Sequence, residues 1–565
     1  MSETGDHTPR WLPWGLFALA VLVSAVTWWG DFTYDDFPII VESDRIHSPN
    51  QWHRLWTESH WERPRGGTMG NWRPLTLSTF ALNWWVSGGA PWSFHLINTL
   101  LHSAVTLVLF SLARVILRGP WPAALAAALF AVHPLHTEAV ANTVGRSEIL
   151  AALFALMAWQ AHRRGQPVRA PLWFALGLLS KESAITIIGV MALDDWLGRP
   201  GEMGGPRWQL RRWVGPLTVI PVYLVARWAA LGQLGLGEQP SSFTLINPLL
   251  AEGMGWITQW ATAIRGLGLQ WWLFVWPADL VADYSWRHLE LSPGFFDPST
   301  AVAALAMLGL AALAIRTRRQ RPEIALSIGL WFLTALLTSN LILTVGVLFA
   351  ERLVYLPSAG MCLLFGALVG WGEAVQRRPF QGALVVICAV ILVAASVRTI
   401  RRSWDWGDNL RLWQHDVRVA PRSSQAWAAL GVELQLLERH PEAREALERA
   451  VRLSRMQEGG PPLNARALEH LAGVLLKMAE EATLEGRAVR AAQLHTACDQ
   501  AIVQCLAVHP GNAVATSYLA LRHHQRGEED LARVAFQRAL ALDPENPVVQ
   551  ANWEYFLSRT GPPDG

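Results

Sequence analysis

Charged residues are scarce in this 565-residue chain. They make up 16% of it, against 52% hydrophobic residues, whereas an ordinary soluble domain carries about 25% charged residues. This composition argues against a wholly water-soluble protein. Tyrosine is scarce too, with 6 residues against 31 Trp, and Trp prefers the membrane–water interface, where its ring is half wet. The sequence therefore predicts a membrane protein rich in interfacial tryptophan.

Cysteine is rare as well, and its four positions provide no disulfide framework. Cys362 and Cys388 lie in apolar runs, whereas Cys498 and Cys505 share one predicted helix and are too far apart along its axis to bridge comfortably. Several nucleotide-binding and hydrolase motifs are missing. The chain has no P-loop, no G-x-G-x-x-G that opens a helix after a strand, and no G-x-S-x-G nucleophile elbow.

Long apolar runs predict about eleven membrane spans, since a helix of roughly 20 apolar residues crosses a bilayer. The run 11–30 is interpreted as a retained first span and not as a cleaved signal peptide. Segment 171–193 is interrupted by Ser180-Lys181-Glu182-Ser183, and is either one long span or two short helices that meet there. The remaining predicted spans are 93–117, 121–135, 147–161, 214–231, 299–315, 324–340, 357–375 and 380–398.

Arginine clusters between these spans favour one orientation, because basic residues concentrate in cytoplasmic loops. All five clusters fall on the cytoplasmic side if 171–193 is a two-helix hairpin and the Trp-rich stretch 255–277 does not cross. The N-terminus is then cytoplasmic and the C-terminal region extracytoplasmic, in the inner (plasma) membrane of a bacterium or the endoplasmic reticulum membrane of a eukaryote. The predicted outer loops are 31–92, 133–147, 180–184, 232–298 and 340–357.

From about residue 404 the composition turns to Ala, Leu, Glu and Arg with helical periodicity. The tetratricopeptide pattern fits twice, and a stretched copy between the two puts Cys498 and Cys505 at small-residue packing positions. We therefore predict a membrane domain over 1–403 and a domain of about three repeats over 404–565. Such repeats expose a concave groove that usually binds peptide or protein. A rigid spacer is the alternative.

Two adjacent carboxylates, Asp35 and Asp36, follow the first span on the predicted outer face. Carboxylates near the membrane can supply a general base or bind a metal, although their spacing alone also fits a solvated helix end. Arg73 precedes the second span. Its fork of donors matches phosphate oxygens, and an arginine at the lipid headgroups is also a common anchor.

Lysine occurs only twice, as Lys181 and Lys477. Lys181 falls at membrane depth beside Glu182, where an ionisable pair is costly and is by default a hypothesis of a functional site. A lysine that faces an aqueous cavity can hold a lipid-linked phosphate. The alternative is a structural pair in which Lys181 and Glu182 neutralise each other.

Further polar residues gather near the predicted outer ends of the spans. His133 and His136 lie near Glu138 and could ligate zinc, but no further His or Cys completes a site, so hydrogen bonding to a polar substrate is favoured. Arg146 begins the fourth span on the same face, and Arg352 precedes the tenth. Cations and carboxylates thus converge on one face of a helix bundle, which suits a lipid-phosphate-sugar donor.

At these motifs the sequence resembles the TMTC family, the transmembrane and tetratricopeptide-repeat-containing proteins. The order of the motifs, the topology and the C-terminal repeats agree along nearly the whole chain, although the family's repeat array is usually longer. The matching residues are Tyr34-Asp35-Asp36, Arg73-Pro74-Leu75-Thr76, Phe94-His95-x-x-Asn98-x-x-x-His102, His133-Pro134-x-His136-Thr137-Glu138-Ala139-Val140 with Gly145-Arg146, Ser180-Lys181-Glu182, Asn247-Pro248, Asp283-Tyr284-Ser285, and Ser339-Asn340 through Glu351-Arg352-x-x-Tyr355-x-Pro357-Ser358.

The resemblance implies an all-α protein, a GT-C-type glycosyltransferase bundle followed by a tetratricopeptide α-solenoid. It implies an inverting transfer of a sugar, expected to be mannose, from a polyprenyl-phosphate-linked donor to Ser or Thr hydroxyls of a protein on the extracytoplasmic side. By similarity, Asp35 is the base, and Asp36 orients it or substitutes for it. Arg73 and Lys181 look like ligands of the lipid phosphate. The residues implied to line the sugar or phosphate cavity are Arg146, Glu138, His133, His136 and Arg352.

The expected partners are the lipid-linked donor, the membrane, and an acceptor protein or peptide bound by the repeats, with no nucleic acid. No metal is predicted as a cofactor, although some enzymes of the broader fold use a divalent one. Two other functions compete: a non-enzymatic membrane scaffold whose repeats assemble an envelope protein complex, and a lipid-phosphate flippase. The scaffold needs neither Lys181 nor the acidic pair, and the sequence lacks the internal symmetry typical of a transporter.

Overall fold

Helices make up the regular structure of this chain. The computed structural model describes residues 8–61, 70–198, 210–235, 245–251, 253–285, 287–375, 378–455 and 463–560. No β-strand occurs in these ranges, so the predicted all-α class is confirmed. The chain divides into two compact units. Unit 1 comprises Met1–Gln239, Glu252–Ala282 and Leu291–Leu412, and unit 2 comprises Pro240–Ala251, Asp283–Glu290 and Trp413–Gly565. Because no single cut separates these units, the predicted division at residue 404 stays a prediction.

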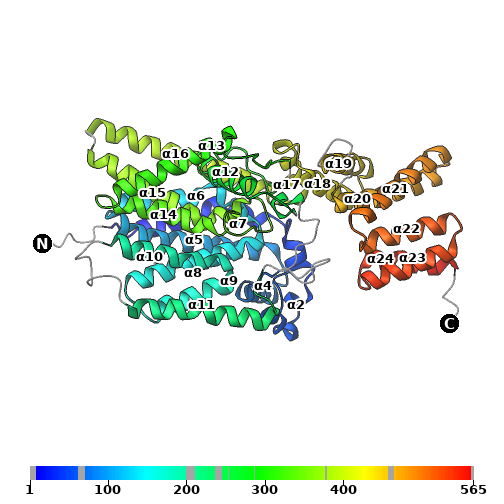
Figure 1. The fold of residues 1–565 in the computed structure, drawn as a ribbon, viewed down its shortest axis with the longest axis horizontal. Helices are drawn as coiled ribbons and strands as arrows, with labels where there is room; N and C mark the ends of the chain where they lie inside the picture. Colours follow the sequence, from blue (N-terminus) through cyan, green and yellow to red (C-terminus); the bar gives the residue numbers. More distant parts are fainter. Residues whose placement is uncertain are drawn as a thin grey trace. The chain divides into compact units, whose positions relative to one another are not determined.

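Unit 1 is a bundle of long helices (Figure 1). Its earlier helices are α1 (Leu12–Ser24), α4 (Pro74–Ser87), α5 (Pro91–Leu117), α6 (Pro120–Val132), α8 (Arg146–Arg163), α9 (Arg169–Ser180) and α10 (Ile187–Leu197). Its later helices are α11 (Leu210–Leu231), α12 (Trp256–Val275), α13 (Pro298–Thr317), α14 (Pro322–Leu336), α15 (Tyr355–Val375) and α16 (Arg378–Asp405). Its short elements include α2 (Asp44–His47), α3 (Arg54–Thr57), α7 (Thr137–Ala141), η1 (Ala25–Trp29), η2 (Phe37–Val41), η4 (Pro134–His136), η5 (Thr143–Gly145), η6 (Glu182–Thr186) and η9 (Glu351–Val354).

The interior of unit 1 is apolar, and much of its surface is too. Helices α5, α6, α8 and α15 pack on one another and bury side chains such as Leu109, Phe130 and Trp159. Helices α11, α13 and α16 are apolar but have only 11–17% of their most apolar windows buried. An exposed apolar surface of this extent is unfavourable in water and suits lipid. The predicted multi-pass membrane character is therefore confirmed.

Among the described residues, fewer helices meet the length and hydropathy expected of a membrane span than the sequence predicted. Six described helical segments are long and apolar enough to cross a membrane, and the bent pair Pro120–Val132 and Pro134–Ala141 would make a seventh. About eleven spans were expected from the apolar runs. The excess arises because α9, α10 and α14 have only 12, 11 and 15 residues, and because α8 includes charged residues at both ends.

Segment 171–193 forms two helices, as one of the two sequence interpretations predicted. Helix α9 ends at Ser180, Lys181 is extended with φ −161° and ψ 138°, and η6 then leads into α10. The polar tetrapeptide therefore lies at a break in the helix. Helix α9 packs on α4, α8 and α11, whereas α10 packs on α8 and α14, so the break falls where several elements of unit 1 meet.

Unit 2 contains three packed helix pairs and a terminal helix (Figure 1). These are α18 (Ser424–Leu436) with α19 (His440–Leu453), α20 (Ala465–Leu484) with α21 (Ala488–Val508), α22 (Ala513–Gln525) with α23 (Glu529–Leu542), and α24 (Pro547–Thr560). The middle pair is the longest, as the stretched repeat predicted. Cys498 and Cys505 are buried on α21, and burial raises the pKa of each thiol to about 12. Both are packing residues, as predicted.

Candidate active site

Asp36 is buried inside unit 1 and fixes the backbone around it. Its carboxylate accepts three backbone N–H bonds, from Thr33 at 3.1 Å, Thr143 at 3.3 Å and Val144 at 2.8 Å. Burial raises the pKa of Asp36 to about 7, against the opposing effect of these hydrogen bonds. Because both oxygens are engaged, Asp36 is placed to orient the turn. Its environment argues against the expectation that it could substitute for Asp35 as a base.

Asp35 lies on the same turn but has a different environment. The turn is strained, since Tyr34 adopts the left-handed conformation with φ of +53°, which costs a non-glycine residue about 1–2 kcal/mol. The Tyr34 N–H donates to Asn409 Oδ1 at 2.9 Å. Asp35 Oδ2 is 3.8 Å from Arg352 Nη2, and the two side chains are 19% and 21% exposed. Arg352 also contacts Glu138 through its guanidinium, and its backbone N–H donates to Glu138 Oε2 at 2.8 Å. One guanidinium therefore lies between a partly exposed and a buried carboxylate.

Arg73 and Lys181 each meet a carboxylate from another element. Arg73, at the N-cap of α4, forms a two-pronged ion pair with Glu182 of η6, in which Nε is 3.2 Å from Oε2 and Nη2 is 2.9 Å from Oε1. Lys181 contacts Glu148 in the first turn of α8. The expected alternative of a Lys181–Glu182 pair is therefore incorrect, because the two residues have different ion-pair partners.

These two ionic groups belong to one region of unit 1. The Thr76 hydroxyl of α4 donates to the Ser180 carbonyl at 2.9 Å and so holds the start of α4 against the end of α9. Burial lowers the pKa of Arg73, but Glu182 and Glu148 together raise it above its ordinary value, while the charge of Arg352 opposes this rise. Charges influence one another in this way only over short distances. Arg352 therefore lies within the range of charge–charge interaction from Arg73.

The two predicted histidines are bound to protein groups. His133 Nε2 donates to the Phe274 carbonyl at 2.9 Å, and its ring stacks on the Phe274 ring. His136 Nδ1 donates to the Phe130 carbonyl at 2.8 Å, and Nε2 is 2.7 Å from Ser358 Oγ. In the described ranges no group of three or more His, Cys, Asp or Glu side chains is arranged to hold a metal ion. The contacts of both histidines favour a role in joining segments of unit 1 over direct contact with substrate.

Arg146 is fully buried and has a scaffolding environment. Its guanidinium lies over the rings of Phe80 and Phe94. It donates hydrogen bonds to Asn98 Oδ1 at 2.8 Å, Asn83 Oδ1 at 2.9 Å, Phe94 O at 3.1 Å and Thr79 O at 3.2 Å. With four of its donor contacts taken by protein groups, Arg146 holds α4, α5 and α8 together. This position argues against the expectation that it lines a sugar or phosphate cavity.

Sequence reasoning singled out Glu182 as a neighbour of Lys181 but did not predict its pairing with Arg73, which lies 109 positions away. It also assigned no role to Glu148 as the partner of Lys181, or to His60. His60 is buried, and neither ring nitrogen has a hydrogen-bond partner in the part of the chain that the structure describes. Burial holds the pKa of His60 well below its ordinary value, and the charge of Arg73 lowers it further.

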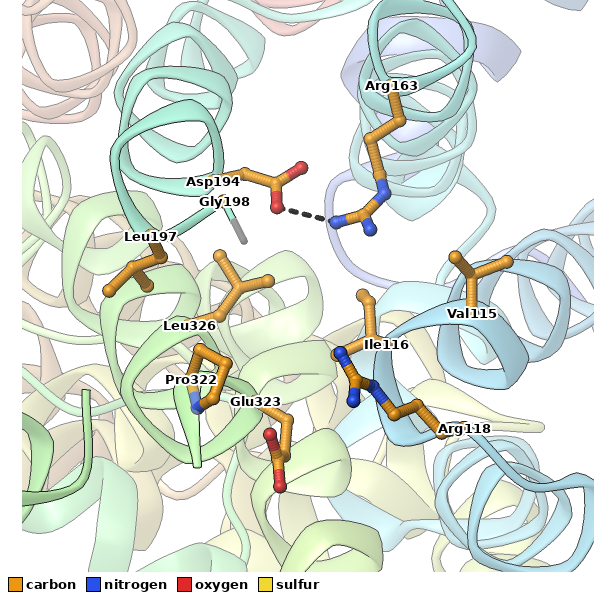
Figure 2. A pocket seen from close by; sticks show the side chains of 10 residues that line it. All are labelled: Val115, Ile116, Arg118, Arg163, Asp194, Leu197, Gly198, Pro322, Glu323 and Leu326. Carbon is orange, nitrogen blue, oxygen red and sulfur yellow. Dashed lines mark hydrogen bonds and ion pairs between the residues drawn. The ribbon is translucent and has the colours of Figure 1, made fainter. Parts of the chain in front are cut away.

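A separate cavity of about 40 Å³ lies among α5, α8, α10 and α14 (Figure 2). It is lined by Val115, Ile116, Arg118, Arg163, Asp194, Leu197, Gly198, Pro322, Glu323 and Leu326. Arg163 Nη1 is 2.5 Å from Asp194 Oδ1 across it. None of the predicted site residues lines this cavity, so it is distinct from the ionic groups around Arg73 and Arg352.

Fold and site together define a class of protein: an all-α, multi-pass membrane protein with a helical-repeat unit and a cluster of partly exposed ion pairs in its membrane unit. Comparisons with known proteins narrow this class. The chain is 26% identical over 455 residues to mouse "Protein O-mannosyl-transferase TMTC3", covering 74% of this chain and 49% of the relative. It is 28% identical over 534 residues to Drosophila melanogaster "Protein O-mannosyl-transferase Tmtc1", covering 78% and 61%. It is 27% identical over 481 residues to human "Protein O-mannosyl-transferase TMTC4", covering 75% and 64%.

These relatives are TMTC proteins, which confirms the resemblance to the TMTC family predicted from the sequence motifs. The chain spans about half the length of the first of them. No family model matches the chain. A solved structure, "Crystal Structure of ArnT from Cupriavidus metallidurans bound to Undecaprenyl phosphate", aligns over 88% of this chain and 80% of that chain, at 14% identity and a TM-score of 0.35. That score is too low to support an inference about fold or ligand.

Proposed function

We propose that this protein is an integral-membrane, inverting glycosyltransferase of the GT-C type that moves a sugar from a polyprenyl-phosphate-linked donor to Ser or Thr hydroxyls of an acceptor protein. The names of its relatives, protein O-mannosyl-transferases, favour mannose as the sugar. They give no support to a non-enzymatic scaffold. A metal is not part of the proposal.

One observation carries this proposal: partly exposed cations and a carboxylate occupy one region of unit 1. The charge of Arg352 lowers the pKa of Arg73, and Asp35 Oδ2 lies 3.8 Å from Arg352 Nη2. Transfer from a lipid phosphate needs a proton acceptor for the incoming hydroxyl and positive charge for the leaving phosphate. Both chemical requirements are met by these side chains.

In the proposed reaction, the Asp35 carboxylate takes the proton of the acceptor hydroxyl as its oxygen attacks the anomeric carbon. The bond from that carbon to the phosphate oxygen breaks, and the lipid phosphate leaves with the bonding electron pair. Arg73 and Lys181 stabilise the charge that grows on the phosphate, which lowers the energy of the transition state more than that of the bound donor. Arg352 orients Asp35 and contacts the sugar–phosphate junction. A single displacement inverts the anomeric centre.

The acceptor and the orientation in the membrane are also proposals. The arginine distribution favours a cytoplasmic N-terminus and an extracytoplasmic repeat unit. Helical repeats usually bind peptides or proteins on an extended surface, so the repeat unit is proposed to recruit the acceptor. The membrane is the inner membrane in a bacterium or that of the endoplasmic reticulum in a eukaryote.

The test is a transfer assay with the purified full chain, a polyprenyl-phosphate donor carrying radiolabelled mannose, and Ser- and Thr-containing protein acceptors. Label is expected in the acceptor with the wild-type protein and with Asp44→Asn, which changes an exposed carboxylate in the same predicted loop. Label is expected to be lost with Asp35→Asn. Donor consumption without any dependence on Asp35, or no transfer of any polyprenyl-linked sugar, would contradict the proposal.

A further inference from the structure

The strongest candidate phosphate ligand is already occupied by a glutamate. Arg73 holds Glu182 through two parallel contacts of 3.2 Å and 2.9 Å. A phosphate offers two oxygens with a spacing that the same guanidinium fork accepts. The Glu182 carboxylate therefore stands where a lipid phosphate would have to bind, if the proposed function holds.

The two ion pairs carry no net charge, which matters for the binding of an anionic phosphate. Arg73 and Lys181 contribute two positive charges, and Glu182 and Glu148 contribute two negative ones. A lipid phosphate that arrived while both glutamates kept their places would meet no net positive charge. Like charges brought together at a buried site cost several kcal/mol. Release of one glutamate from its cation would restore one net positive charge for the phosphate.

Exposure distinguishes Glu182 from the other glutamates. Its side chain is 24% exposed, whereas those of Glu148 and Glu138 are 6% and 0% exposed. Glu138 also accepts the backbone N–H of Arg352, so its departure would leave a buried donor without a partner. Glu182 lies in the short 3-10 turn between α9 and α10. Moving the Glu182 carboxylate into solvent therefore costs less free energy than moving that of Glu148 or Glu138.

We propose that Glu182 is an exchange ligand of Arg73: it holds the guanidinium when the site is empty, gives way to the lipid phosphate, and returns when the product leaves. The donor phosphodiester carries one negative charge, whereas the product phosphomonoester carries about 1.5 to 2 at neutral pH. The product is thus the tighter ligand of the cations. Return of Glu182 to Arg73 competes with the product and speeds its release.

The test measures binding of farnesyl phosphate, a short polyprenyl phosphate, to the purified full chain in detergent, with farnesol as the probe that lacks phosphate. Glu182→Gln is expected to lower the Kd for farnesyl phosphate about tenfold or more, because a competing negative charge is removed. The Kd for farnesol is expected not to change. In turnover, the same variant is expected to be inhibited by farnesyl phosphate at lower concentrations than the wild type.

Glu323→Gln is the matched control, because Glu323 is also a mostly buried glutamate 3.6 Å from an arginine, but lines the cavity of Figure 2. It is expected to leave farnesyl phosphate binding unchanged.

If Glu182→Gln does not fold, Glu182→Asp is the second variant. It weakens the two-pronged pair by shortening the side chain, and should tighten the binding of farnesyl phosphate in the same direction but by less. Unchanged or weaker binding in the variant that folds overturns the inference. If Arg73→Gln abolishes binding while Glu182→Gln does not tighten it, only this inference fails. If neither the wild type nor the Glu182 variants bind, the proposed site fails with it.

Discussion

Unit 1 contains two clusters of ion pairs that differ in how far their carboxylates are exposed. In the first, around Arg73 and Arg352, every cation has a carboxylate partner, yet Glu182, Asp35 and Arg352 remain partly exposed. In the second, Asp194 receives hydrogen bonds from Arg163 and from the Trp159 indole at 3.0 Å. We call the second cluster closed because its carboxylate, Asp194, is only 4% exposed, and the first cluster open because Glu182 and Asp35 are 24% and 19% exposed.

In the second cluster, the neighbouring Asp195 also receives its hydrogen bonds from protein side chains. Its Oδ2 accepts from His162 Nε2 and from the Trp213 indole, each at 3.0 Å. His162 and Asp195 are almost fully buried. Breaking a buried pair is costly because the remaining partner loses both its charge partner and its solvent. A closed cluster of this kind joins helices α8, α10 and α11, whereas an open one can exchange partners. The contrast between binding and scaffolding can be tested residue by residue.

The largest expected effect is the loss of sugar transfer when Asp35 of the open cluster is replaced. Asp35→Asn removes the proposed base and should lower kcat for sugar transfer by about 10²- to 10⁴-fold, the range usual for general-base catalysis. The midpoint of thermal unfolding should hardly change, because the Asp35 side chain is 19% exposed, whereas Asp36 is fully buried. The measurement is kcat together with a melting curve. Full activity in a folded variant would remove Asp35 from the mechanism.

A second prediction compares two variants, each of which replaces one arginine, Arg73 in the open cluster or Arg163 in the closed cluster. Arg73→Gln should lower kcat/KM for the lipid-linked donor by about 10²- to 10³-fold, as the loss of a transition-state donor commonly does. Arg163→Gln should leave kcat/KM near the wild-type value and lower the melting temperature. Donor titrations and melting curves of both variants check this. Equal losses of activity in the two would show that openness does not distinguish the clusters.

Sequence reasoning predicted the parts of this picture that depend on local composition. Apolar runs predicted a multi-pass helical protein. The polar tetrapeptide at Ser180–Ser183 gave a helix break as one of two interpretations, because four polar residues interrupt an apolar pattern. The repeat periodicity placed Cys498 and Cys505 at packing positions. Six or seven described helical segments are long and apolar enough to cross a membrane, since helices such as α9 and α14 are apolar but have only 12 and 15 residues.

The ion-pair partners could not be predicted in the same way. Arg73 and Glu182 are 109 positions apart, and Lys181 and Glu148 are 33 apart, so their pairing depends on how the helices pack. Arg146 shows the complementary difficulty. A buried arginine that binds substrate and one that bonds to backbone carbonyls have the same sequence signal, and only the contacts of Arg146 with Asn83, Asn98 and Phe94 reveal its role.

A third prediction tests the closed cluster by stability. Asp194→Ala removes the acceptor of both Arg163 and Trp159, and leaves a largely buried guanidinium and a buried indole N–H without it. The free energy of unfolding should fall by about 3 kcal/mol. Denaturation of the purified protein, followed by tryptophan fluorescence, measures this. Asp44→Asn, an exposed carboxylate, is the control and should change it by less than about 0.5 kcal/mol. A stable Asp194 variant would mean that the cluster does not hold the helices together.

The smallest expected effect concerns Asp36, which lies next to the open cluster but is bonded like a member of the closed one. Burial raises its pKa to about 7 in the folded protein, against about 3.9 in the unfolded chain. The unfolded state therefore loses its proton first as the pH rises, and folding stability falls between about pH 4 and 7 and levels off above pH 7. Between pH 6 and pH 8 the wild type should lose about 1.4 kcal/mol relative to Asp36→Asn, whose amide does not titrate. Melting curves of the two proteins across this interval measure the difference. If the stability of the two proteins changes with pH in the same way, Asp36 is charged in both the folded and the unfolded state. Burial would then not raise its pKa, and Asp36 would not resemble the carboxylates of the closed cluster.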